Sequence, residues 1–206
     1  VLIDGKSDNT AKVMSVLIDN GTIIDLLDGY VDPGTGDTAI DLNNYTVLPG
    51  LMDMHTHLSG ESNPQKYMER FPLDLDDYAY QSIRFAERTL LAGFTTVRDL
   101  GGPVNTSLRD AIKKGYLIGP RIFSAGKSLA TTGGHADPTN GRAVGEYDDP
   151  LPEDGVVNGP YEVYKAVRQR YTEGADGLKI TVKSGGFRDS KAGNTPQVHE
   201  EEVNDL

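Results

Sequence analysis

Short apolar segments alternate with helical patterns along most of this chain, and the alternation restricts its fold more than any other feature. Four segments are typical of strands, at about 48–58, 94–100, 121–125 and 176–182. Strands that alternate with helices form a parallel sheet with helices on its faces. The sequence therefore predicts an α/β fold over residues 48–206, containing four βα units.

The clearest helical pattern lies over residues 74–92, where apolar and aromatic side chains recur on one face. The members of this face are Tyr78, Ile83, Phe85, Leu90 and Leu91. Gly93 follows them and is expected to end the helix, because glycine readily adopts the left-handed conformation of a C-terminal cap. Shorter helices are predicted over 106–114 and 161–173, and Tyr161 and Tyr164 are expected to pack the second of these.

Residues 1–47 are predicted to form a separate small β domain, a partial β-sandwich. Asn20-Gly21 separates two apolar runs, Val16-Leu17-Ile18 and Thr22-Ile23-Ile24. Asn-Gly between β-branched runs is a strong signal for a two-residue hairpin turn.

The composition excludes several classes of partner. The formal net charge of −11 argues against nucleic acid or an anionic membrane surface, since both require a basic protein face. No apolar run approaches the roughly 18 residues of a membrane span, so a soluble protein is expected, either cytoplasmic or periplasmic. The chain has no cysteine, which rules out disulfides and thiolate metal sites. A small-molecule ligand and a homo-oligomer remain compatible with these features.

The first parallel strand ends in two histidines. Side chains alternate along a strand, so His55 and His57 share one face with Asp53. Two neutral imidazoles at a strand end can hold one divalent ion, and Asp53 could orient one of them. The alternatives are two polar residues at a strand end and a buried, hydrogen-bonded Asp53.

Three motifs, in order, extend this pattern. Pro49-Gly50-Leu51-Met52-Asp53-Met54-His55-Thr56-His57 comes first, then Thr131-Thr132-Gly133-Gly134-His135-Ala136-Asp137, then Gly174-Ala175-Asp176-Gly177-Leu178-Lys179-Ile180. Together they resemble the amidohydrolase superfamily of metal-dependent hydrolases. The nearest resemblance is to the branch of Xaa-Pro and related dipeptidases and imidazolonepropionase-like hydrolases. It covers nearly the whole chain, but only the N-terminal half of such an enzyme.

The resemblance implies a fold as well as a reaction. Residues 48–206 are expected to form the first half of a (β/α)₈ TIM-type barrel, preceded by the β domain of residues 1–47. Four strands cannot close a barrel, so this sequence is expected to be part of a longer enzyme whose C-terminal half is absent here. The alternatives are a second chain that completes the barrel and a piece that is not catalytic by itself. In such barrels the functional groups lie at the carboxyl ends of the strands.

Lys179 is the third predicted metal ligand. Alternation places Leu178 and Ile180 on one face and Lys179 on the other, toward the barrel interior. A buried ammonium beside metal ions is costly, and reaction of the amine with carbon dioxide gives an anionic carbamate. The resemblance implies that this carbamate bridges two divalent ions, expected to be zinc, with His55 and His57 on the first. The alternatives are a lysine that reaches solvent and, as a weaker candidate, Lys183.

Substrate contacts are assigned to two further residues. His135 lies in a long irregular stretch, residues 126–160, of the kind that is usually functional or disordered. The resemblance implies that His135 binds substrate, the alternative being a solvent-exposed loop histidine. Asp99, at the end of the second strand, is a second candidate contact. His199 precedes three glutamates and is expected near a helix N-terminus rather than on a metal.

The implied reaction is hydrolysis of an amide or peptide bond in a dipeptide-like substrate, by a hydroxide held between two metal ions. The family's general-base Asp and its remaining histidines are expected beyond Leu206, so no catalytic acid or base is assigned in this half. Imidazolonepropionase-like or N-acyl amide hydrolysis on the same fold stays open. So does a metal-binding fragment without turnover.

Overall fold

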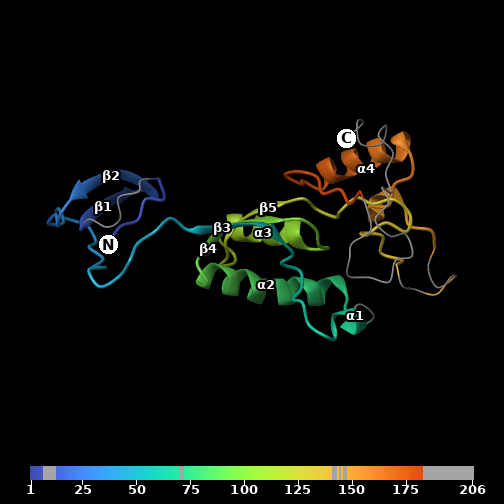
Figure 1. The fold of residues 1–206 in the computed structure, drawn as a ribbon, viewed down its shortest axis with the longest axis horizontal. Coiled ribbons are helices and arrows are strands. Elements are labelled where there is room, and N and C mark those ends of the chain that lie inside the picture. Colours follow the sequence, from blue (N-terminus) through green and yellow to red (C-terminus); the bar gives the residue numbers. More distant parts are fainter. Residues whose placement is uncertain (7–12, 70–71, 141–142, 144, 146–147, 183–206) are drawn as a thin grey trace. The chain divides into compact units, whose positions relative to one another are not determined.

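A computed structural model of the protein describes residues 1–6, 13–69, 72–140, 143, 145 and 148–182 (Figure 1). The chain divides into two compact units, Val1–Gly50 and a second that begins at Leu51. The sequence predicted this division between residues 47 and 48. Among the helices of the described ranges, none has the length and hydropathy of a membrane span.

The first unit contains an antiparallel pair, β1 (Met14–Asp19) and β2 (Thr22–Asp28). The turn between them is Asn20-Gly21, with φ of 46° and 73°. Two successive left-handed residues form the turn that matches the twist of a hairpin, so the predicted hairpin is confirmed. A parallel bridge between Leu2 and Val47 joins the two ends of the unit.

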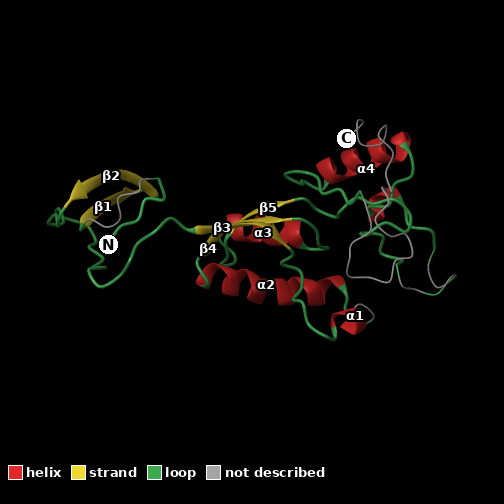
Figure 2. Cartoon of the chain, viewed as in Figure 1, coloured by secondary structure: helices red, strands yellow, loops and turns green. Residues whose placement is uncertain are grey.

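The second unit is built on a three-stranded parallel sheet of β3 (Leu51–Thr56), β4 (Phe94–Asp99) and β5 (Arg121–Ser124), in that order (Figure 2). Its register aligns Thr56 with Asp99 and Asp99 with Ser124. The carboxyl ends of all three strands therefore meet at one edge. The predicted parallel α/β arrangement is confirmed for these strands.

The helices follow the predicted alternation. They are α1 (Lys66–Glu69), α2 (Leu75–Leu91), α3 (Asn105–Lys113) and α4 (Pro160–Thr172), with a 3₁₀ turn at Pro152–Asp154. At the start of α2 the carboxylate of Asp77 accepts the backbone N–H of Asp74 at 3.0 Å, which satisfies one of the unpaired donors of a helix terminus. Gly93, with φ of 97°, follows the helix as predicted.

Two apolar clusters lie in this unit. Leu58, Ala86, Val97, Leu108 and Ile122 form the first, to which α2, α3 and the sheet contribute. Leu129, Val157, Val163 and Ala166 form the second, between α4 and the long loop. The first cluster packs the sheet against α2 and α3, and the polar residues His55, His57 and Asp99 lie at or just beyond the carboxyl ends of its strands.

The packing of three predicted helix residues was wrong. Leu91 is 77% exposed, Tyr161 is 88% exposed and Tyr164 is 40% exposed. The core face of α4 is formed by Val163, Ala166 and Arg170, spaced three and four residues apart. Tyr161 is two residues before Val163, about 200° around the helix axis, and so faces away. Leu91 follows half-buried Leu90 and therefore lies about 100° further around the helix, away from the core.

The predicted strand over 176–182 was also wrong as a regular strand within the described residues. Ile180 forms a single parallel bridge with Leu129. The segment after β5, which would have to pair with residues 176–182, is irregular. Its Leu129 pairs with Ile180, but the next residue, Ala130, pairs with Val156 instead. A ladder requires a regular partner strand.

A polar link fixes the start of this segment. The carboxylate of Asp176 accepts the backbone N–H of Ser124 at 2.8 Å and forms an ion pair with Arg109 of α3 at 2.7 Å. Arg109 also donates to the Gly174 carbonyl at 2.7 Å. The segment that carries Lys179 is thereby tied to both β5 and α3.

We expect Asp176→Asn to lower the free energy of unfolding at pH 7 by up to about 1 kcal/mol, because the ion pair is partly exposed. Partial burial acts to raise the pKa of Asp176, but the Ser124 N–H and the Arg109 charge outweigh it and hold the pKa below its usual 3.8. A lowered folded-state pKa stabilises above the unfolded pKa and is lost as pH falls through the folded value. The difference between variant and wild type should therefore shrink below pH 3.8 in urea titrations.

The matched control is Asp28→Asn, an exposed carboxylate of β2. It should change the free energy of unfolding little at either pH. A deficit for Asp176→Asn that is equal at pH 7 and at low pH would show that the carboxylate charge is not what stabilises the segment.

Candidate metal and substrate site

The predicted histidine pair lies at the carboxyl end of β3. The ring centroids of His55 and His57 are 5.4 Å apart, with their planes inclined at 61°. Both residues are exposed. They share an open hollow along β3 with Asp53, Thr56 and residues of α2. Two imidazoles in this arrangement are close enough to donate to one ion.

The ring of His57 is fixed by the main chain. Its Nδ1 lies 2.8 Å from the carbonyl oxygen of Gly101, in the loop after β4. A carbonyl oxygen only accepts, so Nδ1 carries the proton and donates. The Nε2 lone pair of His57 is then the one that can bind a metal, as in sites where a hydrogen bond at the other ring nitrogen sets the tautomer.

The charge of Lys179 acts on His55. The pKa of His55 is lowered, first by partial desolvation of its ring, then by the positive charges of Lys179 and His57, with Asp53 opposing them. A lowered pKa favours the neutral imidazole, which is the form that binds metal. Lys179 is half-buried, and its own carbonyl accepts the backbone N–H of Leu129 at 2.7 Å. The segment of Lys179 is thus paired with the chain after β5, and its charge reaches His55 of β3.

The two predicted aspartates bond to the backbone. Oδ1 of Asp53 accepts the backbone N–H of His55 at 2.9 Å. This bond fixes the main chain at the end of β3 and does not involve an imidazole ring. Asp99 is fully buried and accepts the backbone N–H of Leu58 at 2.7 Å. Its other oxygen accepts from Gly101 and Asn105. A substrate contact by Asp99 stays a prediction, while these bonds give its carboxylate a structural role.

His135 is an exposed residue in a tightly held loop. The buried carboxylate of Asp137 accepts the backbone N–H groups of Gly133 and Thr139 at 2.7 and 2.8 Å. A side chain at Gly134 would have no room, because a Cβ there would lie 2.8 Å from the Thr131 carbonyl oxygen. These contacts fix the backbone on both sides of His135. The role of His135 in substrate binding stays a prediction.

The described residues supply only part of a metal site. In those ranges no group of three or more His, Asp or Glu residues converges. Lys183 and His199 lie outside the described residues. Two adjacent imidazoles fit a divalent ion, but a zinc ion takes four ligands. The donor set is compatible with the expected metal and incomplete within this part of the chain.

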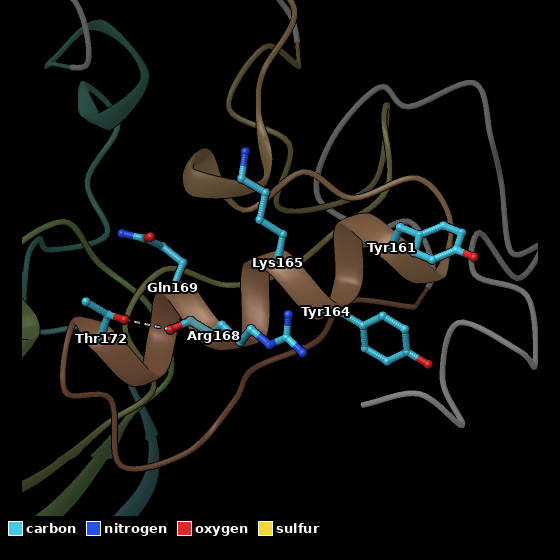
Figure 3. Close-up of a pocket in the computed structure, with 6 residues that line it drawn as sticks. All are labelled: Tyr161, Tyr164, Lys165, Arg168, Gln169 and Thr172. Atoms are coloured by element: carbon cyan, nitrogen blue, oxygen red, sulfur yellow. Dashed lines mark hydrogen bonds between the residues drawn. The ribbon is translucent and has the colours of Figure 1, made fainter.

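A second hollow lies on α4 and has a different character. Figure 3 shows six side chains along this helix, and the only titratable groups among them are tyrosine, lysine and arginine. They are Tyr161, Tyr164, Lys165, Arg168, Gln169 and Thr172. None is a carboxylate or imidazole, and none lines the histidine hollow. This surface lacks the imidazole and carboxylate donors that zinc sites use, so the candidate site is the one along β3.

Sequence reasoning missed the glycines and hydroxyls that support the pair. In the sequence, Gly101-Gly102 indicates only that a strand ends. In the structure, Gly101 packs near the His57 ring and Gly102 packs against Ser59. A Cβ on Gly102 would lie 2.2 Å from the Ser59 Oγ, in the loop that follows His57. Two adjacent glycines after a strand that ends in Asp could have suggested such a close approach of backbones.

The fold and the site define a protein of the mixed α/β class that carries paired imidazoles at the carboxyl end of a parallel strand. The family model described as the amidohydrolase family matches residues 46–204. The chain belongs to the amidohydrolase family, as its motifs indicated.

Several solved and curated proteins are similar to the chain. A crystal structure of a Xaa-Pro dipeptidase with methionine bound in its active site is 52% identical, with a TM-score of 0.93, and the match covers 99% of this chain and 50% of that one. A prolidase in complex with N-methylphosphonate-L-proline is 32% identical, with a TM-score of 0.79, over 93% of this chain and 47% of that one. Ochratoxinase of Aspergillus niger is 30% identical over 173 residues, which are 76% of this chain and 35% of that protein. The chain thus spans half or less of the length of these relatives.

We expect Gly102→Ala to destabilise the protein by about 1–3 kcal/mol, because its Cβ would overlap Ser59 and overpacking costs this much. Gly177→Ala is the matched control, since a Cβ there meets no atom within 4 Å. Its effect should stay within about 1 kcal/mol and can be stabilising. Urea unfolding of both variants measures the difference, and equal stabilities would mean that the loops after β3 and β4 are not in close contact.

Proposed function

We propose that these residues form part of the active site of a metal-dependent hydrolase that cleaves the amide bond of dipeptide-like substrates, Xaa-Pro dipeptides first. One observation supports the proposal above the others: His55 and His57 lie 5.4 Å apart at the end of β3, with the charge of Lys179 acting on His55. The 52% identity to a Xaa-Pro dipeptidase supports the choice of substrate.

The residues have separate roles in this proposal. The neutral ring of His55 and the Nε2 of His57 hold one divalent ion, expected to be zinc. Lys179, as the carbamate formed when its unprotonated amine adds to carbon dioxide and loses a proton, supplies oxygen donors to two ions. When bound, such ions polarise a scissile carbonyl and lower the pKa of a water toward neutrality. His135, carried by the loop that Asp137 holds, contacts the substrate.

A second substrate class has support from one finding. The 30% identity to ochratoxinase supports an amide substrate other than a Xaa-Pro dipeptide, and N-acyl amides are the alternative that the sequence left open. A panel of Xaa-Pro dipeptides, other dipeptides and N-acyl amino acids, assayed with the protein that contains this chain, separates the two. Highest kcat/KM on an N-acyl amino acid would replace the dipeptide assignment, while activity on no amide would remove the hydrolase proposal.

We expect His55→Ala and His57→Ala each to lower kcat/KM by more than about 100-fold, because loss of even an outer partner of a metal ligand costs 10–100-fold. Each variant should also bind less metal, measured by inductively coupled plasma mass spectrometry. Chelation of the wild-type protein should abolish activity, and zinc should restore it. Tyr161→Phe is the control, since Tyr161 is exposed on α4; wild-type metal content in both histidine variants contradicts the proposal.

We expect Lys179→Met to reduce the metal content from two ions to one or none per chain, because methionine cannot form a carbamate. Removal of carbon dioxide and bicarbonate during metal loading should lower the wild-type content, and bicarbonate should restore it. Lys165→Met, at an exposed lysine of α4, should retain both ions. Two ions in Lys179→Met would exclude Lys179 as a bridging ligand.

A further inference from the structure

We infer that Asp99 is a positioning residue for His57: its buried carboxylate fixes the two main-chain segments that hold the His57 ring in the Nδ1–H tautomer. The consequence for metal binding rests on the proposed function. The consequence for the tautomer does not.

The first segment is the chain that follows His57. Asp99 is the last residue of β4 and is fully buried. Its Oδ2 accepts the backbone N–H of Leu58 at 2.7 Å, and Leu58 is the residue after His57. The backbone on the C-terminal side of His57 is therefore tied to the neighbouring strand by a charge-assisted hydrogen bond, which is shorter and stronger than a neutral one.

The second segment is the loop that bonds the ring itself. Oδ1 of Asp99 accepts the backbone N–H of Gly101 at 3.1 Å. The carbonyl oxygen of the same residue, Gly101, lies 2.8 Å from Nδ1 of His57. One carboxylate thus fixes both the backbone of His57 and the acceptor that determines which ring nitrogen carries the proton.

Further bonds hold the peptide that joins Leu100 to Gly101. Its N–H, on Gly101, donates to Asp99, and its carbonyl, on Leu100, accepts the Ser128 hydroxyl at 2.8 Å. Gly101 has a φ of +146° and packs closely on Ser128, since a Cβ there would lie 2.6 Å from the Ser128 Oγ. Buried Asn105, at the start of α3, donates its Nδ2 to Oδ1 of Asp99 at 3.0 Å and so fixes the carboxylate.

The site requires a carboxylate and not an amide. Three N–H donors converge on the two oxygens of Asp99, from Leu58, Gly101 and Asn105. An asparagine has one oxygen and one NH₂ group, so Asp99→Asn directs N–H groups against at least one of these donors. Leaving a buried donor unsatisfied costs free energy that a shift of the loop relieves. That shift moves the Gly101 carbonyl away from His57.

Nitrogen-15 NMR of the metal-free protein tests the inference directly. The chain has four histidines, and the His57 signals are assigned by their loss in His57→Gln. At a pH where the ring is neutral, we expect wild-type His57 to be protonated at Nδ1. In Asp99→Asn we expect a mixture of tautomers. A wild-type ring protonated mainly at Nε2, or an unchanged tautomer in Asp99→Asn, overturns the inference.

Two further variants separate positioning from general destabilisation. Asp137→Asn is the matched control, because Asp137 is also buried and also accepts three hydrogen bonds, all within the loop of residues 133–139. It should leave the His57 tautomer unchanged. Asn105→Ala removes one donor to Asp99 and should give a smaller shift toward the mixture than Asp99→Asn. If Asp99→Asn does not fold, an unchanged tautomer in Asn105→Ala overturns the inference.

Metal affinity provides the second readout. Competition with a chelator should show Zn²⁺ bound about 10–100-fold more weakly by Asp99→Asn than by the wild type, the usual cost of losing the support of a ligand. Asp137→Asn should retain the wild-type affinity. If the wild-type protein binds no Zn²⁺ but its His57 tautomer depends on Asp99, the proposed function fails and the positioning role stands. If Zn²⁺ binds equally well to wild type and Asp99→Asn, the positioning role fails and the metal site stands.

Discussion

The candidate site depends on one buried charge, the carboxylate of Asp99 where β4 ends. Parallel pairing places this carboxylate beside the end of β3, because the register aligns Asp99 with Thr56. Without this carboxylate, the buried N–H of Leu58 and the partly buried N–H of Gly101 would lose their acceptor. The loops after the two strands would then have no reason to approach each other as they do. The histidine pair is therefore held by polar bonds at the strand ends, above an apolar core on one face of the sheet.

A second polar link, at the other edge of the sheet, also fixes a segment that follows the strands. Arg109 and Asp176 join α3 to the segment that follows α4, and Ser124 adds a backbone hydrogen bond. The segment is not a regular strand, yet its main chain still pairs with Leu129 on both sides of Ile180. Lys179 thus reaches the neighbourhood of His55 although two strands separate their segments. In a parallel sheet the carboxyl ends of all strands lie at one edge, and functional groups gather there in barrels built from such strands.

The elements were largely predictable and their packing was not. Helix α2 and the hairpin turn at Asn20-Gly21 carry local signals, since helical spacing and left-handed residues are properties of short segments. Leu91 and Tyr161 were assigned to packed faces because both are large and apolar or aromatic. Which third of a helix surface is covered, however, depends on the neighbours. In α4 the covered face belongs to small and branched side chains, Val163 and Ala166, that fit against Leu129.

By itself, the sequence determined the order of β1 to β5 and of α2, α3 and α4, the family, and the choice of His55, His57 and Lys179 as candidate ligands. These follow from residue type and spacing, which are local. Only the tertiary structure decided what holds them: that Asp99 bonds two loops, that Asp53 bonds the backbone of His55, and that Gly101 is the acceptor of His57. The bond between Asp99 and Leu58 and the bond between His57 and Gly101 join residues more than forty positions apart, whereas Asp53 and His55 are only two apart. The long-range bonds exist because parallel strands bring their ends together. The spacing of residues along one sequence does not show which backbone groups will then need a partner.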